Sequence, residues 1–63
     1  MSNLTRKFWI VADLYDGNEV EYLFPATKEA EARAKYESMR VPFKKLVAIT
    51  DEGDITLEVQ REE

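Results

Sequence analysis

The run from Phe8 to Tyr15 is the most apolar stretch of the chain and constrains its fold more than any other feature. Its β-branched and aromatic residues predict a strand rather than a helix. Because side chains alternate between the two faces of a strand, Phe8 and Ile10 share one face, while Trp9 shares the other with Val11. A strand with bulky apolar side chains on both faces is expected in the middle of a sheet or at an interface.

The chain is short and lacks the residues that commonly build reactive sites. It has 63 residues, with no Cys and no His, so disulfides, thiolate metal sites and a histidine general base are absent. A domain of this size has an expected free energy of unfolding of about 3 to 9 kcal/mol. The sequence predicts one domain over residues 1–63, with residues 1–6 and 61–63 frayed, stabilised by packing and without a metal or cofactor.

Neither a targeting segment nor a membrane span is expected. Residues 1–7 lack the apolar core of a signal peptide, and no run approaches the roughly 20 apolar residues that cross a bilayer. The absence of Cys fits a reducing compartment. The sequence therefore predicts a cytoplasmic protein with no membrane contact.

A hairpin is expected after the first strand, because Asp16 and Gly17 are typical of a turn and residues 18–24 alternate polar and apolar. A two-residue loop would oppose Ala12 to Glu21 and divide the apolar side chains between the two faces. We therefore predict a three-residue loop, Tyr15 to Gly17, which pairs Phe8 with Phe24 and places Gly17 in a left-handed conformation.

A helix is predicted from Lys28 to about Arg40, with Thr27 as its N-cap and Pro42 just beyond its end. Two apolar stripes compete for the sheet-facing side at 100° per residue. We favour the small stripe, Ala30 and Ala34 with Val41, because it would let the helix approach closely. The larger stripe, Ala32 with Tyr36 and Met39, is the alternative.

The last third of the chain predicts a second hairpin, residues 46–50 and 55–60 around the turn Asp51 to Asp54. By analogy with the first hairpin, a three-residue loop ending at Gly53 would oppose Ile49 to Ile55. The fold class is then α+β: a ββαββ order in which one helix covers one face of a four-stranded, mainly antiparallel sheet. Strand order stays open. The expected core consists of Phe8, Ile10, Ala12, Leu14, Val20, Tyr22, Phe24, Ala30, Ala34, Val47, Ile49, Ile55, Leu57 and Val59.

The sheet face away from the helix is the first candidate for binding. An apolar centre that includes a Trp, surrounded by acidic residues, has the composition of a protein interface. We predict a protein-binding module that acts stoichiometrically, as an inhibitor or accessory factor, on another protein or as a homodimer. Its apolar anchors and two rim charges would be Trp9, Val11, Leu23, Leu46, Glu21 and Glu58.

Nucleic-acid binding is the alternative function, because residues 28–45 carry a net charge of +3 within a chain of net charge −4. The stretch Phe24 to Ala30, following a hairpin, is faintly similar to the arm-DNA-binding domains of tyrosine recombinases. Those domains are basic and have three strands before the helix, whereas this chain is acidic and has two. The basic residues of this alternative are Lys28, Arg33, Lys35, Arg40, Lys44 and Lys45.

Carboxylates gather around both turns, where they could imitate nucleic-acid phosphates or bind a divalent cation weakly, although acidic turns are also common devices for solubility. The spacing at Asp51 to Asp54 lacks the ligand periodicity of a calcium loop. Both glycines, Gly17 and Gly53, are explained by turns, so no phosphate-binding loop is present. We therefore expect no enzymatic activity, no catalytic residues and no small-molecule substrate.

Overall fold

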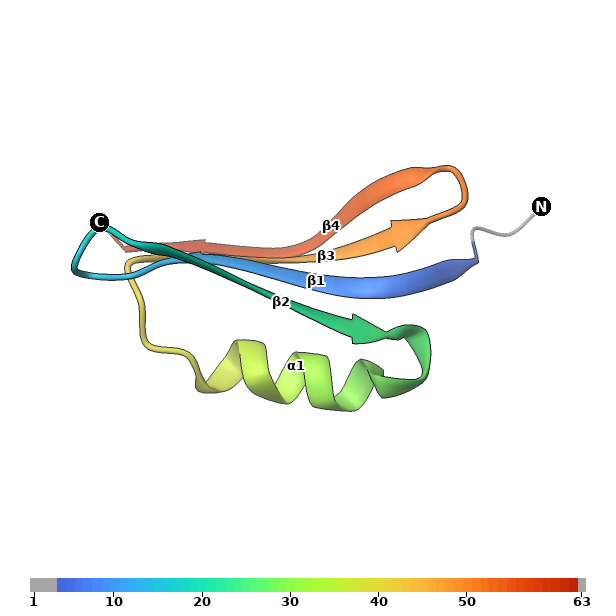
Figure 1. The fold of residues 1–63 in the computed structure, drawn as a ribbon, viewed down its shortest axis with the longest axis horizontal. Coiled ribbons are helices and arrows are strands. Elements are labelled where there is room, and N and C mark those ends of the chain that lie inside the picture. Colours follow the sequence, from blue (N-terminus) through green and yellow to red (C-terminus); the bar gives the residue numbers. More distant parts are fainter. Residues whose placement is uncertain (1–3, 63) are drawn as a thin grey trace.

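The computed structural model describes residues 4–62 and confirms the ββαββ fold (Figure 1). The strands are β1 (Thr5–Asp13), β2 (Glu19–Pro25), β3 (Phe43–Thr50) and β4 (Gly53–Arg61), and they form one antiparallel sheet in the order β2-β1-β3-β4. A 3-10 turn (Ala26–Lys28) leads into the helix α1 (Glu29–Ser38), which lies along one face of the sheet.

The central position predicted for the first strand is confirmed, since β1 lies between β2 and β3. Its N-terminal residues Thr5 and Arg6, together with Arg61 of β4, belong to strands, although we expected them in frayed ends. The same expectation for residues 1–3 and 63 lies outside the described part of the chain.

The first hairpin has the predicted register. Phe8 opposes Phe24, and Ala12 opposes Val20. Leu14 closes the three-residue loop by donating its N–H to the Asn18 carbonyl at 2.7 Å. Gly17 has a φ of 93°, which is the left-handed conformation that the loop requires and that glycine adopts without a steric penalty.

The predicted register of the second hairpin is wrong. Thr50 opposes Gly53, so the loop has two residues, and Ile49 faces Asp54 instead of Ile55. The pairing shifts further along, where Leu57 is an extra residue of β4 between Thr56 and Glu58. This bulge lets Leu57 pack against the core beneath the helix, while Val59 pairs with Lys45 on the other face.

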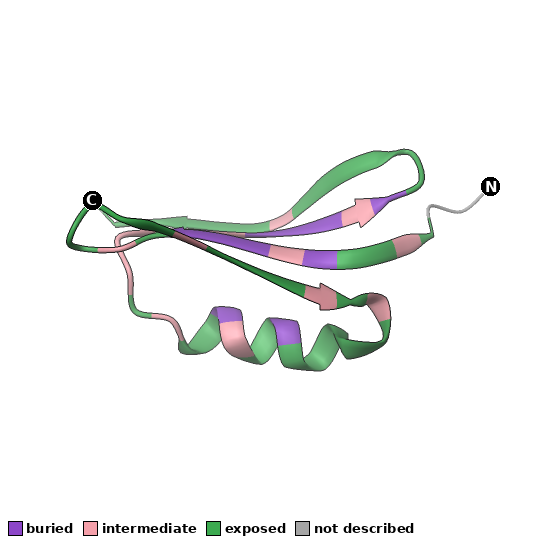
Figure 2. Ribbon diagram, in the orientation of Figure 1, coloured by how far each residue is buried: buried purple, intermediate pink, exposed green. Residues whose placement is uncertain are grey.

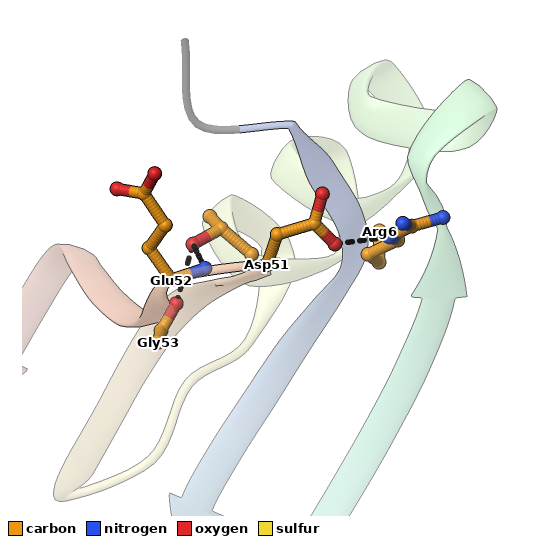
Figure 3. A network of polar contacts seen from close by, with 5 residues as sticks. Arg6, Asp51, Glu52 and Gly53 are labelled. Atoms are coloured by element: carbon orange, nitrogen blue, oxygen red, sulfur yellow. Dashed lines mark hydrogen bonds and ion pairs between the residues drawn. The ribbon is translucent and has the colours of Figure 1, made fainter. Parts of the chain in front are cut away.

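Side-chain bonds hold this shorter loop (Figure 3). The Thr50 hydroxyl donates to the Gly53 carbonyl at 2.7 Å and accepts the Glu52 N–H at 3.1 Å. Beside it, the Arg6 guanidinium meets the Asp51 carboxylate at 2.6 Å and ties β1 to the turn. Asp51 raises the pKa of Arg6 by a hydrogen bond and by its charge. This ion pair is exposed, so we assign the turn geometry mainly to Thr50.

The helix begins and ends inside its predicted range. Thr27 is not its N-cap, because it lies in the preceding 3-10 turn, and Lys28 occupies the cap position without a side-chain bond. At the other end, Met39 has an extended conformation and its N–H bonds the Tyr36 carbonyl at 3.3 Å. The helix therefore stops before Arg40.

The favoured helix face is also wrong. Ala32 and Tyr36 are buried, whereas Ala30 and Ala34 are exposed. Ala32 lets the helix approach the sheet, and the Tyr36 ring fills the space over the strands. The alternative stripe thus combines one small and one large residue, and it is continued by Met39, which packs at the edge of the core.

The core lies between α1 and the face of the sheet that this helix covers (Figure 2). Several expected core residues lie elsewhere: Val47 and Ile49 are on the opposite face, and Tyr22, Ile55 and Val59 are exposed. The expectation is wrong for β3 because Leu46 pairs with Ile10, which turns the even-numbered residues of this strand towards the helix. The buried cluster consists of Phe8, Ile10, Ala32, Tyr36, Leu46 and Ala48, with Phe24, Met39 and Leu57 packed against it.

Enlarging Ala32 tests this packing. We expect Ala32→Leu to lower the free energy of unfolding by about 1 to 3 kcal/mol, because extra methylenes in a well-packed core force neighbours apart. Ala30→Leu makes the same change at an exposed position of the same helix and should change stability by less than about 0.5 kcal/mol. Urea unfolding measures both. Equal losses in the two variants would contradict the assigned helix face.

Candidate protein-binding face

We call the side of the sheet opposite α1 the open face. Directly opposed residues share a face, so the strand pairings assign its members in four cross-strand rows. From β2 through β1 and β3 to β4, these rows are Glu19, Asp13, Phe43, Arg61; Glu21, Val11, Lys45, Val59; Leu23, Trp9, Val47, Thr56; and Pro25, Lys7, Ile49, Asp54.

The open face has an apolar centre. Val11 and Val47, on the two central strands, are buried although neither belongs to the cluster beneath the helix. Trp9 is half-buried between them and the edge, and Leu23 and Val59 on the edge strands are 59% and 60% exposed. Two of the most exposed aliphatic side chains of the described residues therefore lie on this face.

Polar contacts hold the Trp9 ring against the sheet. Its indole N–H donates to the Glu21 carboxylate at 3.2 Å, across the pair of strands β1 and β2. From the other side, the Lys45 ammonium lies 5.8 Å from the ring centroid. Opposite charges thus flank the ring, which reduces its freedom to rotate and presents its remaining surface in one orientation.

The structure brings together four of the six predicted binding residues. Trp9, Val11, Leu23 and Glu21 all lie on the open face, in two adjacent rows. The prediction is wrong for Leu46, which is fully buried under the helix, and for Glu58, which opposes Leu46 and so belongs to the helix side. Both errors come from the pairing of β3 with β1: Leu46 opposes Ile10, so the even-numbered residues of β3, and with them Glu58, lie on the helix side.

Other members of the open face were missed. Val47 and Val59 were assigned to the core, and Phe43 and Arg61 were given no role. The Arg61 guanidinium lies 4.9 Å from the centroid of the Phe43 ring. No signal in the sequence identifies them, because β3 has apolar side chains on both faces and only its pairing with β1 turns Phe43, Val47 and Ile49 away from the helix.

The six basic residues do not form one surface. Lys44 and Lys45 are adjacent in β3, so they point to opposite faces of the sheet. Lys28 and Arg33 pair with Glu31 and Glu29 of the same helix. Arg40 is exposed and lies beyond the end of the helix. The Lys35 ammonium lies 4.5 Å from the Tyr22 ring centroid.

Lys44 is buried and contacts the end of the helix. Its ammonium donates to the Tyr36 carbonyl at 2.6 Å and to the Met39 carbonyl at 3.1 Å, at the end of α1. It also lies 4.4 Å from the Tyr36 ring centroid. Because it bonds the carbonyls at the end of α1, the Lys44 ammonium compensates the negative end of the helix dipole. Separately, burial and the charges of Glu58 and Glu37 raise the pKa of the Tyr36 hydroxyl.

A hollow of about 420 Å³ opens beside this residue, between the end of α1, the first turn and the end of β4. Its lining includes both signs of charge, Arg40 and Lys44 against Glu37 and Glu62. Glu62 raises the pKa of the exposed Tyr15 hydroxyl, chiefly through a hydrogen bond. Nothing in this mixed lining selects one ligand class.

Residues 4–62 contain no cluster of acidic side chains placed to hold a metal ion. Within the same range, no helix has the length and apolarity needed to cross a membrane. No protein-family model matches the chain, and no curated protein or solved structure is significantly similar to it. The open face is therefore the feature of the chain that bears on its function.

Proposed function

We propose that the protein is a small binding module that engages another protein chain through the open face. The observation that supports this most strongly is the apolar row Leu23, Trp9 and Val47, in which Leu23 is exposed, Trp9 is half-buried and Val47 is buried. Charged rows border it on both sides. Trp is the side chain most often found at the energetic centre of protein interfaces. A central aromatic with charged margins is the usual anatomy of such surfaces.

The proposed action is stoichiometric binding in the cytoplasm, as an inhibitor or accessory factor. A 63-residue chain has little room for a deep cleft, whereas one face of its twisted sheet is not covered by the helix (Figure 1). Binding through such a face needs no rearrangement of the fold, because Trp9 is already oriented by Glu21 and Lys45. A preorganised surface loses less entropy on binding.

A pull-down from a lysate of the source organism tests the proposal. The bait is the wild-type chain beside a Leu23→Ser/Val59→Ser variant, which removes two exposed anchors of the open face. Ile55→Ser is the matched control, because Ile55 is an exposed aliphatic of the same edge strand on the helix side. Wild type and Ile55→Ser should recover the same protein, and the double variant should recover at least about tenfold less, since interface anchors carry most of the binding energy.

Nuclease treatment separates the two function classes. A partner that resists nuclease and depends on Leu23 and Val59 supports protein binding. Recovery of nucleic acid, or of proteins that disappear with nuclease, would favour the basic residues instead and would overturn the proposal. Equal recovery by both variants would also count against it, because the open face would then not be the contact. Failure of the folded wild type to bind any protein, itself included, would remove the proposal altogether.

A further inference from the structure

Charge is distributed over the open face in a pattern that complements itself. In the first two rows, the acids Glu19, Asp13 and Glu21 lie on β2 and β1, while the bases Lys45 and Arg61 lie on β3 and β4. Among the described residues, none of these five side chains takes part in an ion pair within the chain. Glu21, Lys45 and Arg61 already contact the rings of Trp9 and Phe43. These rings are neutral, so each of the five charges can still pair with an opposite charge from outside.

The row at the far end of the face repeats the pattern with the signs reversed. Lys7 lies on β1 and Asp54 on β4. The remaining row, Leu23, Trp9, Val47 and Thr56, carries no charge. In every charged row, acids and bases thus lie on opposite sides of the line between β1 and β3.

We infer that the open face binds a second copy of this chain, with a two-fold axis parallel to the strands along the line between β1 and β3. This inference rests on the proposed function, because it names the partner of the same face. Rotation about that axis brings β2 of one copy over β4 of the other. Glu19 then faces Arg61 of the partner subunit, Glu21 lies near the partner's Lys45, and the apolar rows meet at the centre.

The alternative two-fold axis in the plane of the face, perpendicular to the strands, is less favourable. It brings each row onto a different one, so that Glu21 lies over the partner's Leu23 and Lys45 over the partner's Val47. This axis does pair Asp13 with the partner's Lys7 and Arg61 with the partner's Asp54. However, it places Glu21 and Lys45 over the uncharged row, away from any opposite charge, which is costly. Under the parallel axis charged rows meet charged rows, so Lys45 lies over the partner's Val11 but next to the partner's Glu21.

The size of the face sets the expected affinity. Strands about 4.8 Å apart, with about 3.3 Å per residue, give a sheet face of roughly 500 to 600 Å² per copy. Two copies would bury about 1,100 Å² in total, slightly below the roughly 1,200 to 2,000 Å² of standard stable interfaces. We therefore expect a reversible dimer that dissociates in the micromolar range. Aligned packing of two sheets about 10 Å apart is a common way to cover such faces.

Complementary charge reversal tests the dimer by sedimentation of the full chain from about 1 μM to 1 mM, a range that brackets reversible association. Wild type should shift from its monomer mass of 7.4 kDa to twice that value. One variant, Lys45→Glu/Arg61→Glu, makes the β3 and β4 side acidic, and the other, Glu19→Lys/Glu21→Lys, makes the β2 side basic. Each alone should self-associate at least about tenfold more weakly, because like charges then face each other.

Mixing the two variants should restore a dimer, since every facing pair again has opposite signs. Combining all four substitutions in one chain keeps the net charge at −4 and should also restore self-association. Circular dichroism confirms folding, and the single reversals Arg61→Glu and Glu19→Lys, at exposed edge positions, repeat the test where a double variant is unfolded.

The outcomes separate the two proposals. A wild type that stays monomeric at 1 mM, about the weakest association this assay detects, would overturn the dimer. So would reversal variants that associate like wild type, or a mixture that does not recover. If the chain is monomeric but captures another protein through Leu23 and Val59, the inference fails and the proposed function stands. If it does neither, both fail.

Discussion

Leu46→Ala should lower the free energy of unfolding by about 2 to 5 kcal/mol, because it leaves a cavity where the surrounding structure relaxes only in part. Leu46 is fully buried, opposes Ile10 in β1 and contributes to the cluster that contains Tyr36 of the helix. The whole domain is expected to have only about 3 to 9 kcal/mol of stability. A substantial fraction of the variant should therefore be unfolded at 25 °C, which urea titration followed by circular dichroism measures.

Leu23→Ala is the matched control, since it makes the same chemical change at a position that is 59% exposed. At concentrations well below the dissociation constant of the proposed dimer, it should cost less than about 1 kcal/mol, as most exposed substitutions do. A loss at Leu23 as large as the loss at Leu46 would contradict the assigned core and would place the stabilising contacts on the open face.

The first hairpin could be predicted because only one register keeps its apolar residues together. Sliding β2 by one residue would oppose Ala12 to Glu21 and expose half of the apolar side chains, so the pairing of Phe8 with Phe24 is strongly favoured. Local sequence and tertiary packing agree here. The order of elements and the helix position followed from equally local signals, the turn glycines and Pro42.

The second hairpin was not predictable in the same way. Its strands, residues 43–50 and 53–61, carry apolar side chains on both faces, so a shifted register changes which ones are buried without exposing a whole face. The hydrogen bonds of the Thr50 hydroxyl stabilise a two-residue loop. The bulge at Leu57 then places Ile55 and Val59 on opposite faces of the sheet. A bulge has no reliable signature in one sequence. The site residues Leu46 and Glu58 were misplaced for a different reason: the pairing of Leu46 with Ile10 decides which face of β3 lies under the helix, and no signal within the hairpin indicates that pairing.

The helix face depended on a long-range contact. Ala30 and Ala34 form as good a stripe as Ala32 and Tyr36 when the helix is considered alone. A contact from outside the helix favours the observed face: Lys44 in β3 donates to the Tyr36 carbonyl, and its ammonium lies 4.4 Å from the Tyr36 ring centroid. This contact joins residues eight positions apart in different elements, and periodicity within the helix contains no information about it.

Lys44→Met should destabilise the fold by about 1 to 3 kcal/mol, because hydrogen bonds from a charged donor to the two carbonyls at the end of α1 are lost. Met preserves the length of the aliphatic stem and therefore most of its packing. Lys45→Met is the control, since the same change at the next residue removes only an exposed-side contact with Trp9. It should cost less than about 1 kcal/mol.

Hydrogen exchange locates the effect. In Lys44→Met, the amides of the last helical turn, including Met39, should exchange faster relative to those of β1, because the turn opens locally before the sheet unfolds. Uniform acceleration across the chain would mean that Lys44 stabilises the whole core by packing. If Lys44→Met is as stable as wild type or more stable, the free-energy cost of burying the ammonium equals or exceeds the stabilisation from its hydrogen bonds. Replacement of buried ionic groups by apolar ones sometimes has this result. Unchanged exchange at the helix end would contradict the idea that Lys44 helps to hold α1 with Ala32 and Tyr36 against the sheet.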